Sequence, residues 1–255
     1  MLTSFVVYFL GYCMCCHRLW ILLSISSSAF ALYNGSPALP EMPEQGFFTS
    51  RDSALSFKVG YEGDFTFGRH LQVPSVSNPE IYSQFNSAAL TLGFINRIEV
   101  YTLLGASLTQ FSFTSSGQDF HLNTKENFAG EAGIRANTPI WGDLKFGVDA
   151  KYFYVWPTLS KNSGSGSVSQ KEWQVGAAFS QTFAYFTPYA GIKFGKFNME
   201  YVNLSSFSKN ISLQNACPVG LFLGMGIAGQ KGIYVDLEAR FVDEYACTGA
   251  LGLSF

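Results

Sequence analysis

Apolar and polar residues alternate along most of the chain, most clearly in its last segments. From 233 to 241 every odd position is apolar, whereas even positions include Asp236, Glu238 and Arg240. Side chains of a strand point alternately to opposite faces, so one face is apolar and the other charged. A soluble sheet would bury the apolar face in a core, whereas a membrane barrel turns it toward lipid and its charges toward the lumen.

Repetition of this pattern favours the membrane barrel. The chain predicts an all-β protein, a transmembrane antiparallel β-barrel of about ten strands, because an even number of alternating segments can close without a free edge. The expected strands are 53–67, 87–95, 98–113, 128–137, 144–156, a segment around Trp173, 187–197, 219–227, 233–241 and 247–255.

The connections alternate between long and short, an asymmetry typical of outer-membrane barrels. Long loops are expected at 68–86, 114–127, 158–170 and 198–215. The segment 98–113 has the weakest alternation, and its drift near Leu103-Leu104 is compatible with a β-bulge. Aromatic residues near strand ends suggest girdles at the lipid headgroups. These residues are Tyr152, Tyr154, Trp156 and Trp173.

Composition agrees with a barrel. Aromatic residues make up 16% of the chain, while charged residues reach only 13%, about half of the 25% usual in soluble domains. No uninterrupted run of 18 apolar residues follows the first 31, which argues against membrane-spanning helices.

The first 31 residues have the features of a cleaved signal peptide. His17 and Arg18 precede the apolar stretch 19–25, and Ala29-Phe30-Ala31 is an A-x-A cleavage site. Met14 is an alternative start, and a membrane anchor is the alternative to cleavage. The expected organisation is a signal peptide over 1–31, a periplasmic segment over 32–52 and the barrel over 53–255.

Removal of the signal changes the charge and the cysteine count. Loss of Arg18 takes the net charge from −2 to −3, which excludes a strongly basic nucleic-acid footprint. Only Cys217 and Cys247 remain, without the spacing of a zinc site. We therefore expect no metal and no cofactor.

Charged residues on the inward face would line the lumen. Six are basic and seven acidic, so either a weakly selective constriction or a network of ion pairs plugging a narrow barrel is expected. The predicted lumen charges are Lys58, Glu62, Asp64, Glu131, Arg135, Lys145, Asp149, Lys151, Glu172, Lys193, Asp236, Glu238 and Arg240.

An enzymatic function is not expected. His70 and His121 fall in predicted loops, and only the second has an acidic residue, Asp119, nearby. A histidine beside an aspartate in a loop is more often a solvated surface pair than a catalytic one.

Several collinear stretches resemble the major outer membrane protein (porin) family of chlamydiae. They are Ser56 to Phe65, Asn86 to Ala106, Glu172-Trp173-Gln174, Phe186 to Lys193, and Glu238 to Glu244 with the terminal Phe255. The resemblance implies a trimeric outer-membrane porin whose cysteines cross-link the envelope. This chain is shorter than the usual member and lacks the family's cysteine cluster near the N-terminus, although Cys217 matches the cysteine before a glycine-rich strand.

The expected function is an outer-membrane porin for passive diffusion of small solutes that also contributes to envelope structure. The alternative is a non-conducting structural or adhesin-like barrel that presents surface loops. Expected partners are outer-membrane lipids and the barrel assembly machinery, which would read Phe255 at the end of an alternating strand. A homotrimer or disulfide-linked envelope proteins are further possible partners.

The two remaining cysteines lie on either side of one strand. Two strand spacings separate their backbones by about 9–10 Å, beyond the roughly 7 Å within which Cα atoms form a disulfide. Cross-linking through Cys217 and Cys247 to other molecules is therefore the hypothesis, and two free thiols are the alternative.

Overall fold

The computed structural model describes residues 33–41, 54–72, 77–115, 118–124, 126–156, 167–202, 211–229 and 232–255. The predicted signal peptide, residues 1–31, lies outside them, so its cleavage stays a prediction. No helix in this part of the chain is long and apolar enough to cross a membrane.

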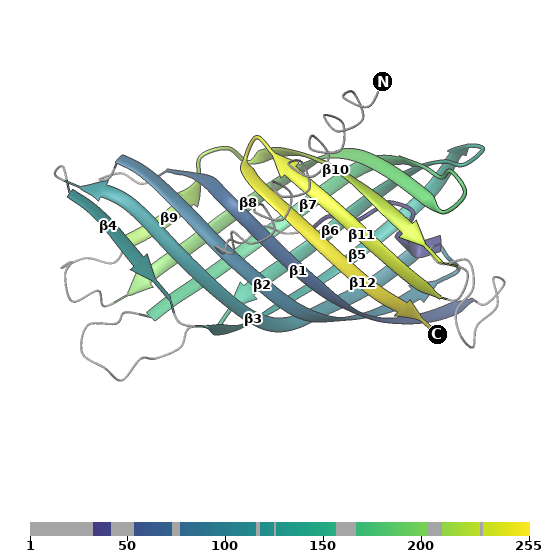
Figure 1. The fold of residues 1–255 in the computed structure, drawn as a ribbon, viewed down its shortest axis with the longest axis horizontal. Coiled ribbons are helices and arrows are strands. Elements are labelled where there is room, and N and C mark those ends of the chain that lie inside the picture. Colours follow the sequence, from purple (N-terminus) through teal and green to yellow (C-terminus); the bar gives the residue numbers. More distant parts are fainter. Residues whose placement is uncertain are drawn as a thin grey trace, which may run out of the picture.

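Ten strands of the described chain form one closed antiparallel barrel (Figure 1). Each pairs with the next wall strand, and β12 returns to β1 along a register that runs from Lys58↔Ser254 to Arg69↔Glu244. Closure confirms the predicted fold class and pairs both edges of the sheet. The wall strands are β1 (Leu55–Gln72), β2 (Ser77–Phe94), β3 (Ile98–Ser115), β5 (Asn127–Trp141), β6 (Leu144–Val155), β7 (Ser167–Gln181), β8 (Phe186–Val202), β10 (Val219–Ala228), β11 (Ile233–Phe241) and β12 (Glu244–Ser254).

The two ends of the barrel differ. At the end that we call the turn end, short connections join β2 to β3, β5 to β6, β7 to β8 and β10 to β11, and the chain terminates there. In the first of these turns Ile95 and Asn96 both have left-handed backbones, with φ of 47° and 54°, as tight hairpins require. The opposite end, which we call the loop end, carries β4 (Gln118–Asn123) and β9 (Ile211–Asn215).

Strand β9 completes the wall at the loop end. The β11–β12 hairpin turns at Val242-Asp243, so these two strands end early on the loop side of the barrel. Strands β1 and β8 extend further toward the loop end. Over that gap β9 pairs with β8 and reaches β1 at Leu71↔Asn215. The barrel is thereby extended beyond its shortest hairpin.

Several strands are longer than the sequence predicted. The expected loop 68–86 is mostly strand, because β1 runs to Gln72 and β2 starts at Ser77, with register shifts at Thr66/Arg69 and Ser77/Glu80. The loop 114–127 likewise contains β4, and part of 198–215 belongs to β8 and β9. In these extensions the alternation is inverted, with Ile81 buried and Glu80 exposed.

The predicted bulge near Leu103-Leu104 is absent. Strand β3 pairs with β5 without a register shift from Ile98↔Ala136 to Ser107↔Asn127. Leu104 faces outward and is 46% exposed, whereas Leu103 faces inward and is 2% exposed. The alternation drifts there because the interior is apolar at this level: Leu103 packs with Phe85 and Phe153.

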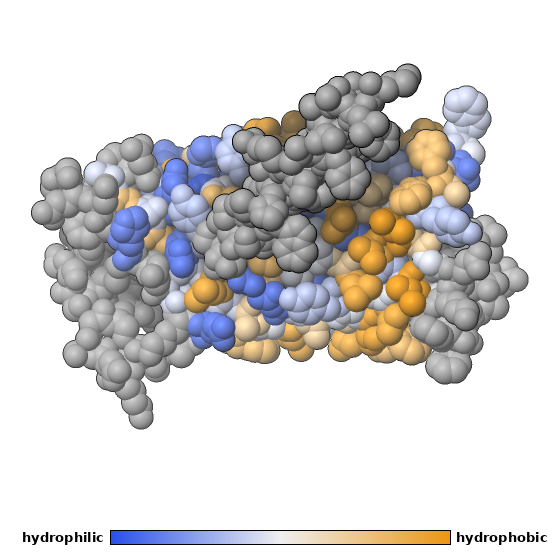
Figure 2. Space-filling view, viewed as in Figure 1, coloured by the Kyte–Doolittle hydropathy of each residue, from blue (hydrophilic) through white to orange (hydrophobic). Residues whose placement is uncertain are grey.

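An apolar belt covers the outer face of the wall. Every wall strand contributes a large apolar side chain that is at least 40% exposed, and Figure 2 shows such side chains gathered toward the turn end. Inward charges and outward apolar groups are the polarity of a wall immersed in lipid. One representative from each strand is Phe57, Leu92, Val100, Ile134, Val148, Val175, Ile192, Leu221, Leu237 and Leu251.

Deletion of Phe255 is expected to lower the amount of folded barrel in the membrane. Its backbone N–H donates to the Phe57 carbonyl at 2.7 Å, the reverse bond is 3.5 Å long, and the two rings lie 6.4 Å apart. The deletion removes two seam hydrogen bonds, each worth about 0.5–1.5 kcal/mol, in addition to the predicted assembly signal. Heat-modifiable protein on gels of isolated membranes measures the effect, with Phe255→Tyr as the control. Wild-type levels of folded barrel in the deletion would contradict it.

Candidate functional site

The structure places the predicted lumen charges on the inward face of the wall. Arg135 and Lys145 are partly buried, and the others are less than 9% exposed. The buried members are Lys58, Glu62, Asp64, Glu131, Asp149, Lys151, Glu172, Lys193, Asp236, Glu238 and Arg240.

Four further charged residues belong to the interior and were missed by the sequence analysis. Arg69 lies in the segment predicted as a loop, Asp243 and Glu244 in the predicted turn, and Glu99 at the start of the weakest strand. Arg69, Glu99 and Glu244 are at most 2% exposed. The even-numbered pattern of β12, in which Glu244 precedes inward Ala246 and Thr248, is the signal that could have revealed Glu244.

A pair of residues from opposite walls spans the lumen. Arg69 on β1 donates to both carboxylate oxygens of Glu172 on β7, at 2.8 and 3.1 Å. In the order of the ten wall strands, β7 is five strands from β1 in either direction, so these strands face each other across the barrel. The Arg69 guanidinium also lies 4.7 Å from the centre of the Phe197 ring. This bidentate pair therefore ties the two opposite walls together inside the lumen.

A cluster of ion pairs surrounds Arg240 beside this bridge. Its guanidinium contacts Asp64 at 2.5 Å, Glu238 at 3.2 Å and Glu244 at 3.3 Å, and the side chain is fully buried. Glu244 in turn pairs with Arg69 and Lys193, so that it joins Arg240 to the bridge. Removal of Arg240 would take a shared cation from three buried carboxylates, which is strongly unfavourable.

A second cluster lies nearer the turn end. Lys58 contacts Glu99 at 2.6 Å, and Arg135 lies between Glu99 at 3.7 Å and Asp149 at 3.8 Å. The guanidinium of Arg135 stacks 4.4 Å from the centre of the Tyr101 ring. Lys151 adds contacts to Asp149 at 3.5 Å and to Glu131 at 3.6 Å.

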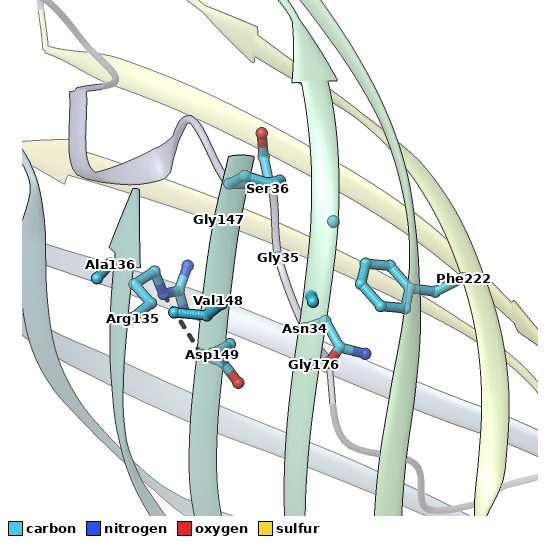
Figure 3. Close-up of a pocket in the computed structure, with 13 residues that line it drawn as sticks. Asn34, Gly35, Ser36, Arg135, Ala136, Gly147, Val148, Asp149, Gly176 and Phe222 are labelled. Atoms are coloured by element: carbon cyan, nitrogen blue, oxygen red, sulfur yellow. Dashed lines mark ion pairs between the residues drawn. The ribbon is translucent and has the colours of Figure 1, made fainter. Parts of the chain in front are cut away.

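Residues 33–41, which we call the plug, lie inside the lumen. The backbone N–H groups of Asn34 and Gly35 donate to the two oxygens of Glu238, both at 3.0 Å, and that of Ser36 donates to Asp236 at 3.3 Å. Figure 3 shows the segment passing Arg135, Asp149 and Phe222. The 3-10 turn η1 (Leu39–Glu41) ends the described plug, and Lys58 donates to the Leu39 carbonyl.

The plug corrects the expectation that residues 32–52 form a periplasmic segment, as far as residues 33–41 are concerned; 42–53 lie outside the described residues. Carboxylates on the inner wall attract backbone N–H groups because buried charges need hydrogen bonds. The wall also makes room: a Cβ on Gly147 would lie 2.5 Å from Pro37, and one on Gly176 would lie 2.4 Å from Asn34. Further hydrogen bonds come from Gln174 to the Asn34 side chain at 2.7 Å and from Asn137 to the Pro37 carbonyl at 2.9 Å.

Apolar side chains also occupy part of the interior. Phe85 and Phe153 meet edge to face at 5.2 Å, in a cluster with Tyr101, Leu103 and Val155 that reaches the cavity beside Tyr33 and Leu39. Nearer the loop end, buried apolar side chains lie among buried polar ones such as Ser83 and Thr109, and all are less than 9% exposed. The apolar ones are Leu71, Ile81, Phe111, Phe113, Phe197, Met199 and Leu213.

Two small cavities border the plug. One cavity, between the plug and β5, β6 and β7, measures about 10 Å³, and another, beside Tyr33 and Leu39, about 30 Å³. One water needs about 10–15 Å³ of such space. These cavities therefore hold isolated waters at most and form no channel for a solute.

The cysteines are two free thiols within the described structure. Cys247 lies on β12 opposite Phe65, and Cys217 lies between β9 and β10, where its thiol donates to the Val219 carbonyl at 3.3 Å. Cross-linking to other molecules stays a prediction.

The barrel defines the class of protein. A closed antiparallel wall satisfies its backbone hydrogen bonds internally, and the apolar belt matches the bilayer interior, which are the two conditions for strands to cross a membrane. The chain is an integral β-barrel protein of the bacterial outer membrane.

Comparisons with known proteins gave likenesses to solved structures only. The sequence matches no protein-family model and no curated protein. The outer membrane protein OprG from Pseudomonas aeruginosa is 10% identical, with 80% of this chain and 97% of that chain covered and a TM-score of 0.41. The translocator domain of the autotransporter NalP from Neisseria meningitidis is 12% identical, with 86% and 91% covered and a TM-score of 0.40.

Proposed function

We propose that the protein is a non-conducting outer-membrane barrel that contributes to envelope structure and presents its loop end to the outside. The observation that carries this proposal is the bidentate pair of Arg69 and Glu172 between opposite walls. The plug on one side of this pair and the apolar interior on the other add two further barriers. The lumen is therefore better suited to hold the wall rigid than to pass a solute.

The loop end is the surface available to partners outside the cell. There β1, β2, β3 and β8 extend past β11 and β12, with polar residues such as Glu80, Lys196 and Glu200 exposed on their outer faces. A wall that is polar outside and apolar inside is stable in water, as an ordinary soluble sheet is. This extension supports a role in display or adhesion.

Passage of small solutes is the second candidate function. Two features favour it. The lumen carries charges of both signs, and the plug is held by hydrogen bonds to Asp236 and Glu238, which are not covalent and can break when the plug moves. Conduction would require the plug, the Arg69 bridge and the apolar interior all to move. Membership of the chlamydial porin family and a trimeric state remain proposals, supported by the sequence resemblance.

We also propose that the barrel has no catalytic role. His70 is exposed and lies edge-on to Tyr245 at 6.1 Å, and His121 is exposed on β4. Neither histidine faces the buried carboxylates of the lumen, which supports the surface interpretation.

An epitope inserted between Ser115 and Gln118 is expected to bind antibody on intact cells. This position joins β3 to β4 at the loop end, whereas the control insertion between Gly142 and Asp143 lies at the turn end. The control epitope should bind only after the outer membrane is permeabilised. Binding of the control on intact cells, or of neither epitope when both barrels are folded in the membrane, would contradict loop display.

A further inference from the structure

Two exposed lysines lie side by side on the outer face of the wall. Lys171 is on β7 and Lys196 is on β8, and both side chains point outward. In the register of these strands Lys196 lies opposite Trp173 and Lys171 lies opposite Asn198. The two lysines are therefore diagonal neighbours, about 7–8 Å apart at the backbone. Among the described residues, no other lysine or arginine has an exposed side chain, so positive charge on the described outer face is concentrated at this place.

Neither lysine has an anionic partner among the described residues. The ammonium groups of Lys171 and Lys196 make no ion pair and no hydrogen bond there. The outer faces of β7 and β8 carry one acidic side chain, Glu200, which lies two residues beyond Asn198 on the loop side and pairs with neither lysine. The segments 157–166 and 203–210, which adjoin these strands in the sequence, contain no aspartate or glutamate. The two ammonium groups are thus available to an anion from outside the protein.

The lysines lie where the apolar belt gives way to polar residues on the loop side. On β8 the outward side chain before Lys196 is Phe194, which is 48% exposed. On β7 the outward side chain next to Lys171 is Trp173, and its ring lies 5.6 Å from that of Phe194. Aromatic rings at the edge of an apolar belt lie at the level of the lipid head groups. The lysines are therefore at the height of the head groups of one leaflet.

Aromatic side chains of the neighbouring strand β6 extend this surface. Tyr152 lies opposite Trp173, and Tyr154 lies opposite Lys171. Trp156 follows at the end of β6, with its ring edge-on to that of Tyr154 at 5.0 Å. Aromatic faces pack against the C–H groups of sugar rings, and ammonium groups bind phosphate through charge-assisted hydrogen bonds. The combination of rings, paired lysines and an adjacent apolar belt matches a lipid whose head group is a phosphorylated sugar.

We propose that the outer surface of β6, β7 and β8 binds a phosphorylated glycolipid of the outer leaflet, with one phosphate between Lys171 and Lys196. The sugar lies against the aromatic rings and the acyl chains lie along the apolar belt. A lysine is a compact charge on a flexible side chain, so two diagonal neighbours converge on one phosphate. Placement in the outer leaflet rests on the proposed function, in which the loop end faces outside. The bound lipid fastens this side of the barrel to the lipid layer, in keeping with a role in envelope structure.

Native mass spectrometry of the folded barrel in non-ionic detergent micelles, titrated with diphosphorylated lipid A, tests the proposal. The wild type should bind one lipid saturably. The double variant Lys171→Gln/Lys196→Gln should bind it at least about tenfold more weakly, because two contacts between lysine and lipid phosphate are lost. The double variant Lys171→Arg/Lys196→Arg keeps both charges and should bind like the wild type. Lipid A without its phosphates should bind the wild type and the glutamine variant equally weakly.

The matched control is Gln84→Glu/Gln110→Glu, which lowers the net charge by the same amount at another part of the wall. Gln84 on β2 and Gln110 on β3 both point outward and are partly exposed. In the order of the ten wall strands β2 lies opposite β8, and β3 is next to β2. This control should bind lipid A like the wild type, and heat modifiability on gels verifies that each variant is folded.

Three results would overturn the proposal. They are equal affinity of the wild type and Lys171→Gln/Lys196→Gln for lipid A, an equal loss of affinity in the control, and binding of phosphatidylglycerol as tightly as lipid A. The last result would indicate a phospholipid site, because phosphatidylglycerol has a phosphate but no sugar ring. Lipid binding in micelles does not depend on which end of the barrel faces outside, so its failure is separate from failure of loop display.

Discussion

Replacement of Arg240 by methionine is expected to lower barrel stability more than any other single substitution on the inner wall. Arg240 is fully buried and contacts Asp64, Glu238 and Glu244. Methionine fills a similar volume but leaves these carboxylates without their shared cation. Breaking a buried ion pair from one side costs about 3–5 kcal/mol, a large part of the 5–15 kcal/mol typical of a folded domain.

Urea unfolding of the refolded protein in detergent micelles measures this loss. The control is Lys196→Met, which removes an exposed charge from β8 and should change stability by less than about 0.5 kcal/mol. Glu238→Gln in the Arg240→Met background should restore part of the stability, because it removes one of the uncompensated charges. An Arg240→Met barrel as stable as wild type would show that the cluster does not hold the interior together.

Deletion of the plug, residues 33–41, is expected to expose the turn half of the lumen while the loop half stays closed. Three backbone N–H groups of the plug bind carboxylates, each bond being worth about 1.5–3 kcal/mol. Spontaneous opening of the intact plug is therefore suppressed on the order of 10²-fold or more. Without the plug, water reaches the wall around Thr91, which lines the cavity beside Tyr33 and Leu39.

Two engineered cysteines on β2 report on the two halves, in a background with Cys217→Ser and Cys247→Ser. Thr91→Cys should react with a charged thiol reagent only after the deletion. Ser83 points inward nearer the loop end and is fully buried. The cysteine of Ser83→Cys should therefore stay protected from the reagent in both proteins. Equal labelling of Thr91→Cys with and without the plug would show that residues 33–41 do not close the turn half.

The sequence predicted the barrel where the wall is in contact with lipid. There the alternation has a simple form, with apolar Leu237 outward and Asp236 and Glu238 inward. Above the belt the polarity reverses, so that Ile81 faces inward and Glu80 outward. A two-residue period with inverted polarity indicated a loop instead, so the last five residues of β1, 68–72, and the first ten of β2, 77–86, were missed.

The interior was predicted only in part. Inward charges such as Glu172 and Arg240 follow from alternation alone, but their partners depend on strand order and register around the closed barrel. The pairing of Arg69 with Glu172 joins residues 103 positions apart, and nothing in the local sequence of either residue indicates it. The plug carries no periodic pattern, and its position is determined by the Asp236 and Glu238 carboxylates together with space at Gly147 and Gly176.

Single-channel recording of the folded wild-type protein in planar bilayers tests the closed lumen most directly. Incorporation is verified independently, by recovering heat-modifiable barrel from the same proteoliposomes that are fused to the bilayer. With the Arg69–Glu172 bridge, the plug and the apolar interior in place, the current should stay at the baseline of the empty bilayer at moderate voltages. Reproducible conductance steps of uniform size from the wild-type barrel would contradict a closed lumen and favour the porin function.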